Sequence, residues 1–321
     1  MKNKKIKNVV VIYWGNDWNC KIPISNEITR HSFEKWHEMG IKKGIEMYRA
    51  SINWYDLRKN VFIKSWAFRN KKWIKIEKNI RPDLVYDKVG GKRDFKSFEK
   101  KLHIAKNVKM FNNPLFRVMV NSKLSQYAIF GEFMPKSFVA MDKSELIQMF
   151  SKIKSKKIVI KPLYGSGGHG IVIDEKEKAI NKKYQYPVLV QEFIVSEKGI
   201  PGFSKKKEIS DLRLVFMNHK LSYALSRIAK KGSLFTNLHQ GASGTLVPVK
   251  YIPKEVVKIA EKIIKKLKIF PEAQYSLDFI FSNSGKPYFV EMNTTPGIDL
   301  ITVLGDEKIK RKSFEDIINL A

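Results

Sequence analysis

The sequence is poor in cysteine and has no long hydrophobic run. Cys20 is the only cysteine among 321 residues, which excludes a disulfide framework and a cysteine metal cluster and predicts a reducing, cytoplasmic compartment. No apolar run approaches the roughly 18 to 20 residues that a membrane helix needs, so we expect no membrane partner. Val9–Trp14 follows several lysines, as in a signal peptide. That run is too short and is followed by Asn16 and Asp17, so we predict a first β-strand instead.

Acidic residues and arginines are scarce relative to lysine. The chain has 61 Lys and Arg, of which 51 are Lys, against 31 Asp and Glu, and its formal net charge is +30. Such a charge suits nucleic acid or an acidic substrate. The lysines are spread along the whole chain, however, without one compact basic arm or an aromatic platform. We therefore favour a lysine-biased composition, and nucleic acid is the less favoured partner.

The positions of the arginines carry more information than the total charge. Between Arg117 and Arg311 the chain has only two arginines, Arg213 and Arg227. Where lysine is the default cation, an arginine indicates a need for a planar, bidentate donor to phosphate or carboxylate. Two ordinary surface salt bridges are the alternative interpretation.

The chain has no internal repeat, no low-complexity tract and no linker rich in proline and glycine. Alternating strand and helix patterns over roughly the first 110 residues predict an α/β unit, with a boundary near 112–114. Asp142 and Glu145 predict a capping box before a helix. The expected strands are 8–14, 45–52, 61–67, 84–89, 136–140, 157–161, 171–174, 187–191, 211–217, 220–228, 275–282 and 286–292, and the expected helices are 26–39, 117–130, 146–153 and 254–268.

A glycine-rich segment follows the strand predicted at 157–161. Gly165, Gly167 and Gly170 satisfy the pattern G-x-G-x-x-G, which in a dinucleotide-binding fold must open a helix. Here Ile171–Ile173 predicts a strand instead. A strand, glycine loop and strand can form a flap that lies over phosphates and donates backbone N–H groups. Lys161 places a cation beside the flap, and a simple tight hairpin is the alternative.

Two strands near the C-terminus carry oxygen ligands. Residues two apart in a strand project from the same face, so Glu291 and Asn293 point together, with Asp278 available across the predicted hairpin. Three such ligands suit Mg²⁺, which takes a few protein oxygens together with nucleotide phosphates. A merely polar hairpin edge is the weaker alternative, because both strands are otherwise apolar and buried carboxylates need cations.

Two further strand regions carry polar residues. Asp211 and Arg213 share one strand face, Arg227 lies in the next strand, and Asn237 follows in a polar loop. Arginines at a transferring phosphoryl group would stabilise the charge that develops there, and structural salt bridging is the competing account. The apolar strand that ends at residues 191–194 can offer backbone groups to a purine edge, or can be an ordinary buried strand.

In this order the motifs resemble the ATP-grasp superfamily, over about residues 115–300. The sequence matches a lysine strand, a glycine flap, a QEFI hinge, a DLR strand, an arginine strand, a TN loop and D…E-x-N followed by TTPG. The glutamate-ligase and glutathione-synthetase-like branch is the most similar, and TNLHQGAS also resembles spore-coat-associated ATP-grasp proteins. The resemblance implies an α/β (α+β) ATP-grasp fold. The domains implied are a pre-ATP-grasp domain (1–114) and an ATP-grasp domain (115–321), divided into a lid-bearing part (115–195) and a metal-binding part (196–321).

The resemblance also implies roles for individual residues. Arg213, Arg227 and Asn237 would be catalytic, and Asp278, Glu291 and Asn293 would bind two Mg²⁺ ions, with Mn²⁺ as an alternative. The residues implied in ATP binding are Lys123, Lys161, Gly165, Ser166, Gly167, Gly168, His169, Gly170, Gln191, Glu192, Phe193, Ile194 and Glu197. Two positions depart from the family pattern: His169 replaces an expected Arg, Lys or small residue, and Phe235 precedes Thr236-Asn237 where glutamate ligases tend to have arginine before the asparagine.

These implications predict an ATP-dependent, ADP-forming carboxylate–amine ligase that works through an acyl phosphate. The expected substrates are an amino acid or a peptide, including an acidic peptide or protein tail, and the resemblance also implies a homodimer. Three alternatives remain open at this point: a nucleotide-binding protein with a structural role, an ATP-grasp phosphotransferase acting on a hydroxyl group, and a nucleic-acid-binding protein.

Overall fold

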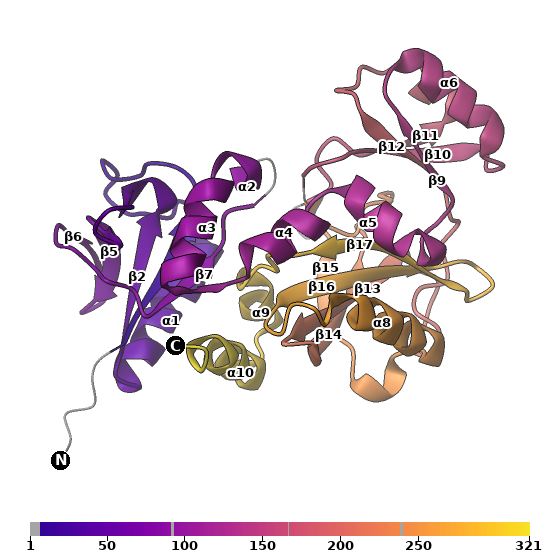
Figure 1. Ribbon diagram of the computed structural model, residues 1–321. Coiled ribbons are helices and arrows are strands. Elements are labelled where there is room, and N and C mark those ends of the chain that lie inside the picture. Colours follow the sequence, from indigo (N-terminus) through magenta and orange to yellow (C-terminus); the bar gives the residue numbers. More distant parts are fainter. Residues whose placement is uncertain (1–6, 91–92, 166, 238–239) are drawn as a thin grey trace. The chain divides into compact units, whose positions relative to one another are not determined.

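The computed structural model describes residues 7–90, 93–165, 167–237 and 240–321 (Figure 1). Contacts within the chain divide it into two compact units. Unit 1 comprises the chain up to Val118 together with Thr295–Ala321, and unit 2 comprises Met119–Thr294. Within the described ranges, no helix has both the length and the apolar character needed to cross a membrane.

A six-stranded sheet forms the centre of unit 1, in the order β6-β5-β2-β1-β7-β8. Its strands are β1 (Lys7–Tyr13), β2 (Ile45–Ser51), β5 (Ser65–Arg69), β6 (Lys72–Ile76), β7 (Leu84–Asp87) and β8 (Lys109–Phe111). The four strands β2, β1, β7 and β8 are parallel, and β5 and β6 pair antiparallel. Residues 9–12 of β1 are almost wholly buried, as expected for a central parallel strand that is covered on both faces.

The strand predicted at 61–67 is two strands. Val61 and Phe62 form β4 (Val61–Phe62), which pairs with β3 (Tyr55–Asp56) in a separate ribbon, and the chain re-enters the main sheet only at β5. The backbone N–H of Ile63 donates instead to the carbonyl of Trp54, at the end of η1 (Ile52–Trp54). The chain therefore turns between β4 and β5, and the residues predicted as one strand contribute to two separate sheets.

Helices flank the sheet of unit 1. They are α1 (Glu27–Lys42), α2 (Arg93–Lys96), α3 (Phe98–Asn107), α4 (Pro114–Val120, which crosses the boundary between the units), α9 (Asp299–Leu304) and α10 (Glu307–Ile318). Asn26 caps α1, because its side chain accepts a 2.9 Å hydrogen bond from the N–H of Thr29. The Trp36 ring on the buried face of α1 lies 5.7 Å from the Phe314 ring of α10, so the C-terminal helices pack within unit 1.

Unit 2 contains a four-stranded antiparallel sheet in the order β11-β10-β12-β9. The elements of this part are β9 (Ser137–Ala140), α6 (Lys143–Lys152), β10 (Lys157–Pro162), β11 (Val172–Glu175), α7 (Lys176–Ala179) and β12 (Val188–Glu192). The predicted capping box is present: Asp142 accepts from the N–H of Glu145, whose carboxylate accepts from the N–H of Met141. Leu146 and Phe150 of α6 then pack against the sheet.

A five-stranded antiparallel sheet in the order β15-β14-β13-β16-β17 completes unit 2. Its strands are β13 (Ser210–Met217), β14 (Lys220–Ile228), β15 (Ser243–Leu246), β16 (Gln274–Phe281) and β17 (Pro287–Asn293). Of the two short helices of unit 2, η4 (Val249–Tyr251) follows β15, and η2 (Gly131–Phe133) precedes β9 of the smaller sheet. Asn218 and His219 both have positive φ, which is typical of the tight turn that joins β13 to β14.

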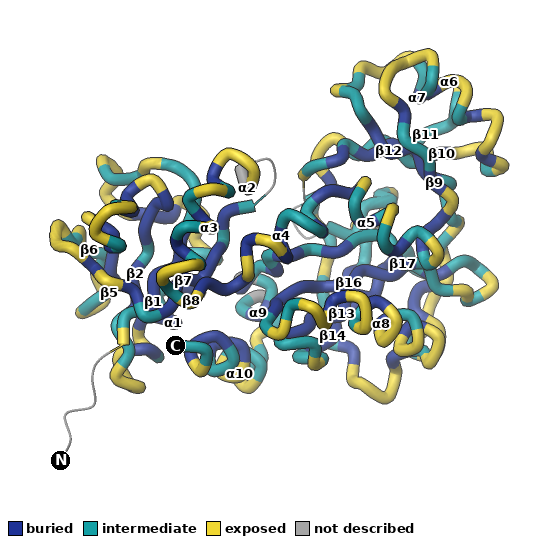
Figure 2. Tube along the Cα trace, in the orientation of Figure 1, coloured by how far each residue is buried: buried dark blue, intermediate teal, exposed yellow. Residues whose placement is uncertain are grey.

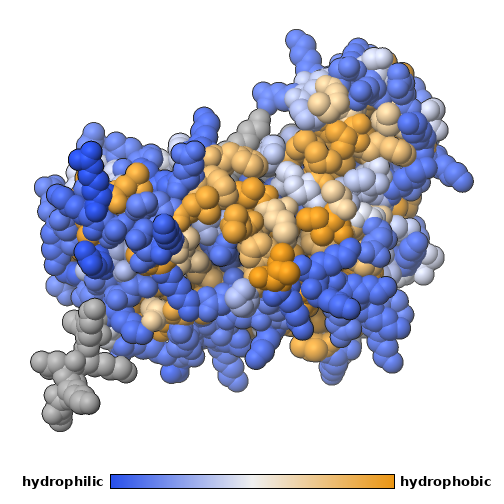
Figure 3. All heavy atoms as spheres, in the orientation of Figure 1, coloured by the Kyte–Doolittle hydropathy of each residue, from blue (hydrophilic) through white to orange (hydrophobic). Residues whose placement is uncertain are grey.

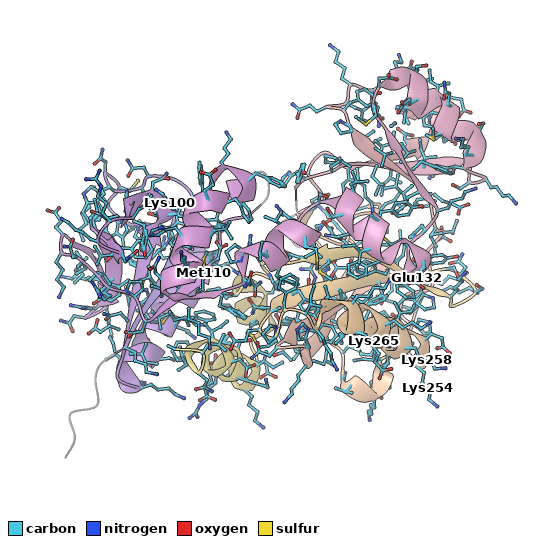
Figure 4. All side chains as sticks on the ribbon, in the orientation of Figure 1. Lys100, Met110, Glu132, Lys254, Lys258 and Lys265 are labelled. Carbon is cyan, nitrogen blue, oxygen red and sulfur yellow. The ribbon has the colours of Figure 1, made fainter. Side chains whose placement is uncertain are left out.

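Two helices of unit 2, α5 (Lys123–Phe130) and α8 (Lys254–Leu267), carry the other predicted helical patterns. The helix predicted at 117–130 is interrupted between α4 and α5, because the Ser122 side chain accepts from the N–H of Ser125 and starts a new helix. In α8 one face is buried and the other is exposed (Figure 2). Lys254, Lys258 and Lys265 lie on the exposed side (Figure 4), and the surface there is mostly hydrophilic (Figure 3).

Candidate active site

Unit 2 contains a cleft of about 1010 Å³, counted with its part open to solvent. Strands β10, β11 and β12 of the smaller sheet line one side, and strands β13, β14, β16 and β17 of the larger sheet line the other. The segment that follows β12 and the loop 234–237 complete the lining. Ten of the predicted site residues line this cleft directly: Lys161, Gln191, Glu192, Phe193, Ile194, Glu197, Arg227, Asn237, Asp278 and Glu291.

The segment predicted to hold a purine leaves β12 along the cleft. The backbone N–H of Glu192 donates to the carbonyl of Lys136 at 2.8 Å, and that of Phe193 donates to the hydroxyl of Ser155 at 3.2 Å. These two amides are therefore already used within the protein. The other backbone groups of the segment would have to read a purine edge.

Apolar side chains form two facing walls of the cleft, and the sequence analysis did not identify them. Val159, Ile171 and Ile173 come from the smaller sheet, and Ile280 and Val290 come from the larger one. All five are half-buried. The available signal was strand periodicity, since alternate residues of a strand face opposite sides: Val159 lies between the buried Ile158 and Ile160, and Val290 follows the buried Phe289.

Lys161 lines the cleft, and Lys123 lies beside Glu291, another residue of the lining. The ammonium group of Lys161 donates a 2.7 Å hydrogen bond to the side-chain oxygen of Gln191, and both residues are buried. Burial lowers the pKa of Lys161 from 10.5 to about 8, although the nearby carboxylate of Glu291 opposes this change. Lys123 donates to the carbonyl of Gly165 at 2.9 Å and lies 3.2 Å from the Glu291 carboxylate. Each lysine can therefore present a cation to a phosphate.

The glycine segment connects two antiparallel strands, as predicted, and does not open a helix. Strands β10 and β11 pair up to Ile160 opposite Val172, and Gly165, Gly167, Gly168 and Gly170 all have positive φ. A Cβ atom added to Gly168 would lie 2.7 Å from the Asn237 Oδ1 atom. His169 is exposed, and Ser166 lies outside the described residues.

A hydrogen bond joins this glycine segment to the polar loop of the larger sheet. The Gln240 Nε2 atom donates to the carbonyl of Gly167 at 3.1 Å. The backbone of the flap can approach this loop closely because its residues are glycines.

The predicted metal ligands lie on neighbouring strands. In the β16–β17 pair, Asp278 is opposite Glu291 and Ser276 is opposite Asn293. No cluster of three or more His, Cys, Asp or Glu residues suited to a metal occurs among the described residues. Two carboxylates and an amide oxygen nevertheless fit Mg²⁺, which takes one or two protein carboxylates and completes its shell with phosphates and water.

Arg227, which lines the cleft, and Arg213, which does not, both take part in a buried network of ion pairs. Arg213 binds Asp278 through two hydrogen bonds of 2.7 and 2.6 Å, and Arg227 binds Asp211 through two of 2.8 and 2.5 Å. A further bond of 2.8 Å joins Arg227 to Asp278. Burial alone would raise the pKa of Asp278, but the two guanidinium groups outweigh it and lower that pKa.

A family model described as "RimK-like ATP-grasp domain" matches residues 124–314. A protein named "Probable alpha-L-glutamate ligase" from Thioalkalivibrio sulfidiphilus is 28% identical over 175 residues, which cover 53% of this chain and 52% of that protein. A protein of the same name from Halorhodospira halophila is 29% identical over 175 residues, with the same two shares. The chain thus spans about half the length of the curated relatives it matches.

Solved structures match nearly the whole chain at low identity. D-alanyl-alanine synthetase A from Vibrio cholerae has a TM-score of 0.65 and 13% identity, over 99% of this chain and 98% of that one. The VanG D-Ala:D-Ser ligase from Enterococcus faecalis has a TM-score of 0.63 and 14% identity, over 98% of this chain and 99% of that chain. The ATP-grasp ligase PsnB, complexed with minimal precursor, has a TM-score of 0.60 and 13% identity, over 98% of this chain and 100% of that chain. These likenesses confirm the predicted ATP-grasp fold.

Proposed function

Because this chain belongs to the family of RimK-like ATP-grasp domains, we propose that it is an ATP-dependent carboxylate–amine ligase that forms ADP and works through an acyl phosphate. One observation carries the proposal. A single cleft of unit 2 is lined by Lys161, Arg227 and two carboxylates that face each other on neighbouring strands, Asp278 and Glu291. Lys123 and Arg213 pair with these carboxylates, and Lys123 also binds the glycine segment. The relatives that bear the name alpha-L-glutamate ligase support the same reaction class.

The nucleotide would lie between the two sheets. Its base would occupy the apolar part of the cleft, between Val159 and Ile280, and Glu197 would reach the ribose. Lys123 and Lys161 would pair with the phosphates, over which the glycine segment would close. Backbone N–H groups in glycine-rich loops are suited to this role because they approach phosphate oxygens without steric hindrance.

Asp278, Glu291 and Asn293 would hold two Mg²⁺ ions, with Mn²⁺ as an alternative. When bound, these ions would neutralise the phosphate charge. Lys123 already lies beside Glu291, at 3.2 Å. The ammonium group of Lys123 thus contacts both this carboxylate and the glycine segment.

The reaction would proceed in two balanced steps. A substrate carboxylate oxygen attacks the γ-phosphorus of ATP, the bond to the bridging oxygen breaks, and ADP leaves. Arg213 and Arg227 stabilise the negative charge on the transferring group. An amine then attacks the acyl carbon, inorganic phosphate leaves, and the nitrogen gives up a proton. Closure of the flap excludes water, which would otherwise hydrolyse the acyl phosphate.

Amino acids and peptides are the proposed substrates. Solved structures of similar fold include an ATP-grasp ligase complexed with a precursor, and a Chryseobacterium gregarium ligase in complex with ADP and a leader and core peptide. The net charge of +30 makes an acidic peptide or protein tail a favourable substrate. Phe235 occupies the position where an arginine is expected in glutamate ligases, so the acceptor need not be glutamate. A cytoplasmic location and a homodimer belong to the same proposal.

The test is release of ADP and phosphate from Mg·ATP against a panel of amino acids, dipeptides and acidic peptides. Hydroxylamine is added in parallel, because it traps an acyl phosphate as a hydroxamate. A ligase needs both a carboxylate and an amine for phosphate release, and yields hydroxamate with the carboxylate alone. Glu291→Ala abolishes both signals, whereas Glu255→Ala, on the exposed side of α8, keeps them. A stable phosphorylated product would instead indicate a phosphotransferase, and nucleotide binding without turnover on any pair would indicate a structural role.

A further inference from the structure

We propose that Asp211 is a positioning residue that holds Arg227 in the cleft and, through Thr236, fixes the loop 230–237 to that arginine. This inference rests on the function proposed above and adds a residue to it. Asp211 lies in β13 and is only 3% exposed. Its carboxylate lines the cleft but lies outside the ligand set of Asp278, Glu291 and Asn293.

The geometry around Asp211 leaves Arg227 little rotational freedom. The register of β13 and β14 places the two residues opposite each other. The Oδ1 atom accepts from Arg227 Nε at 2.8 Å, and the Oδ2 atom accepts from Nη2 at 2.5 Å. Two parallel hydrogen bonds fix the plane of a guanidinium group as well as its position. The orientation of Arg227 is therefore set by the sheet itself.

Arg213 and Arg227 differ in how far their hydrogen bonds depend on Asp278. The Asp278 carboxylate accepts two hydrogen bonds from Arg213 and one from Arg227. A cation held by Asp278 would weaken these bonds, because a carboxylate oxygen that ligates a metal is a poorer partner for a guanidinium group. Arg227 retains its two bonds to Asp211. Within the described residues, the ion pair found for Arg213 is with Asp278 alone, so Asp211 gives Arg227 a support that is independent of the metal site.

The same carboxylate also anchors the polar loop. The hydroxyl of Thr236 donates to Asp211 Oδ2 at 2.5 Å, so one oxygen binds both the arginine and the loop. Residues 234–237 all line the cleft. Lys230 and Lys231, at the start of the loop, are exposed. Asp211 thus ties the loop that lines the cleft to a residue that would contact the transferring phosphoryl group.

Cleavage by trypsin after Lys230 and Lys231 tests the contact with the loop and needs no turnover. Thr236→Val keeps the shape of the side chain but removes the hydroxyl, and we expect about tenfold faster cleavage, since a hydrogen bond to a charged group is lost. Thr236→Ser restores the native rate, and Thr245→Val, at an exposed position of β15, leaves it unchanged. An unchanged rate in Thr236→Val would overturn the anchoring role.

Nucleotide affinity tests the positioning of Arg227. We expect Asp211→Asn to weaken binding of a non-hydrolysable Mg·ATP analogue about tenfold and to leave Mg·ADP affinity unchanged, because Arg227 would contact the γ-phosphate and the variant loses one charge-assisted contact. Equal weakening of both nucleotides, or none, would contradict the positioning role. If the native protein binds neither nucleotide, the proposed function fails, whereas the cleavage test still decides whether Asp211 anchors the loop.

Discussion

Lys161 on β10 and Gln191 on β12 are joined by a buried 2.7 Å hydrogen bond between the ammonium group and the side-chain oxygen. This neutral partner leaves the charge of the lysine uncompensated at that contact. Burial lowers the pKa of Lys161 to about 8. With only a neutral hydrogen-bond partner at this contact, the buried ammonium group is available to bind an anion.

Nucleotide affinity is expected to fall as the pH rises through 8. Below that pH Lys161 is charged and attracts phosphate, and above it the lysine loses its proton. With a pKa of about 8, the protonated fraction decreases about tenfold between pH 7 and pH 9, and Mg·ADP affinity decreases by the same factor. Calorimetry at both pH values measures this change, together with proton uptake on binding near pH 8.

Lys161→Met provides the control for this prediction. The variant is expected to bind Mg·ADP more weakly at pH 7 and to show neither the change in affinity nor the proton uptake. If the variant retains the native pH dependence, another group is responsible for it. The free energy of unfolding should also depend on pH. Burial of the charged ammonium group lowers this free energy fully below pH 8, and progressively less between pH 8 and 10.5 as the lysine loses its proton.

Asp278 and Glu291 are expected to differ in their effects on stability although both serve the same proposed metal site. Asp278→Ala leaves two buried guanidinium groups without this carboxylate, and should lower the free energy of unfolding by about 3–5 kcal/mol. The Glu291 side chain is 26% exposed, so Glu291→Ala should cost about 1 kcal/mol or less. Urea denaturation measures both values. Similar losses in the two variants would contradict the buried network.

Gly168→Ala should impair turnover more than stability. The added methyl group would lie 2.5 Å from Gln240 Nε2 and 2.7 Å from Asn237 Oδ1, so these two side chains of the polar loop would have to shift. Gly202 has nearly the same φ, +77° against +78°, but nothing lies within 4 Å of its added methyl group. Both alanine variants should therefore lose about 1–2 kcal/mol of stability through backbone strain.

Steady-state kinetics separate the two glycine variants. Only Gly168→Ala should lower kcat/KM for ATP, by about tenfold or more, since a displacement of about 1 Å near the reacting groups can cost a factor of 100. Equal activity in the two variants would show that close contact between flap and loop is not needed for the reaction.

Ile280→Ala should weaken nucleotide binding without abolishing catalysis. The substitution removes three carbon atoms from one apolar wall of the cleft. At about 0.8 kcal/mol for each buried methylene group, affinity for Mg·ADP should fall about tenfold or more. Ile269→Ala is the matched control, because Ile269 is 71% exposed. Unchanged affinity in Ile280→Ala would place the base elsewhere.

Local patterns predicted much of unit 2 correctly. The capping pair Asp142 and Glu145, the amphipathic helix α8 and the hairpin of β16 and β17 each depend on residues close together in the sequence. The strand after the glycines was predicted for the same reason, since Ile171–Ile173 favours a strand and not a helix there. The ATP-grasp resemblance added the order of these parts, and the structural likenesses confirm the fold.

Other features depend on contacts that no local pattern encodes. The sequence indicated that Asp211 and Arg213 share a strand face, but it did not show that Asp211 pairs with Arg227, which depends on the register of β13 and β14. Nor did it indicate that α10 packs on α1 in unit 1. The domain boundaries 1–114 and 115–321, and the roles of the individual site residues, stay predictions.

The scarcity of arginine has a practical consequence for chemical labelling. Among residues 118–310 only Arg213 and Arg227 carry a guanidinium group, and both are buried in the ion pairs of the cleft. A reagent selective for guanidinium groups would therefore modify that stretch of the chain only at the cleft. Peptide mapping of the modified protein would follow the accessibility of these two side chains directly, against a background of lysines that do not react.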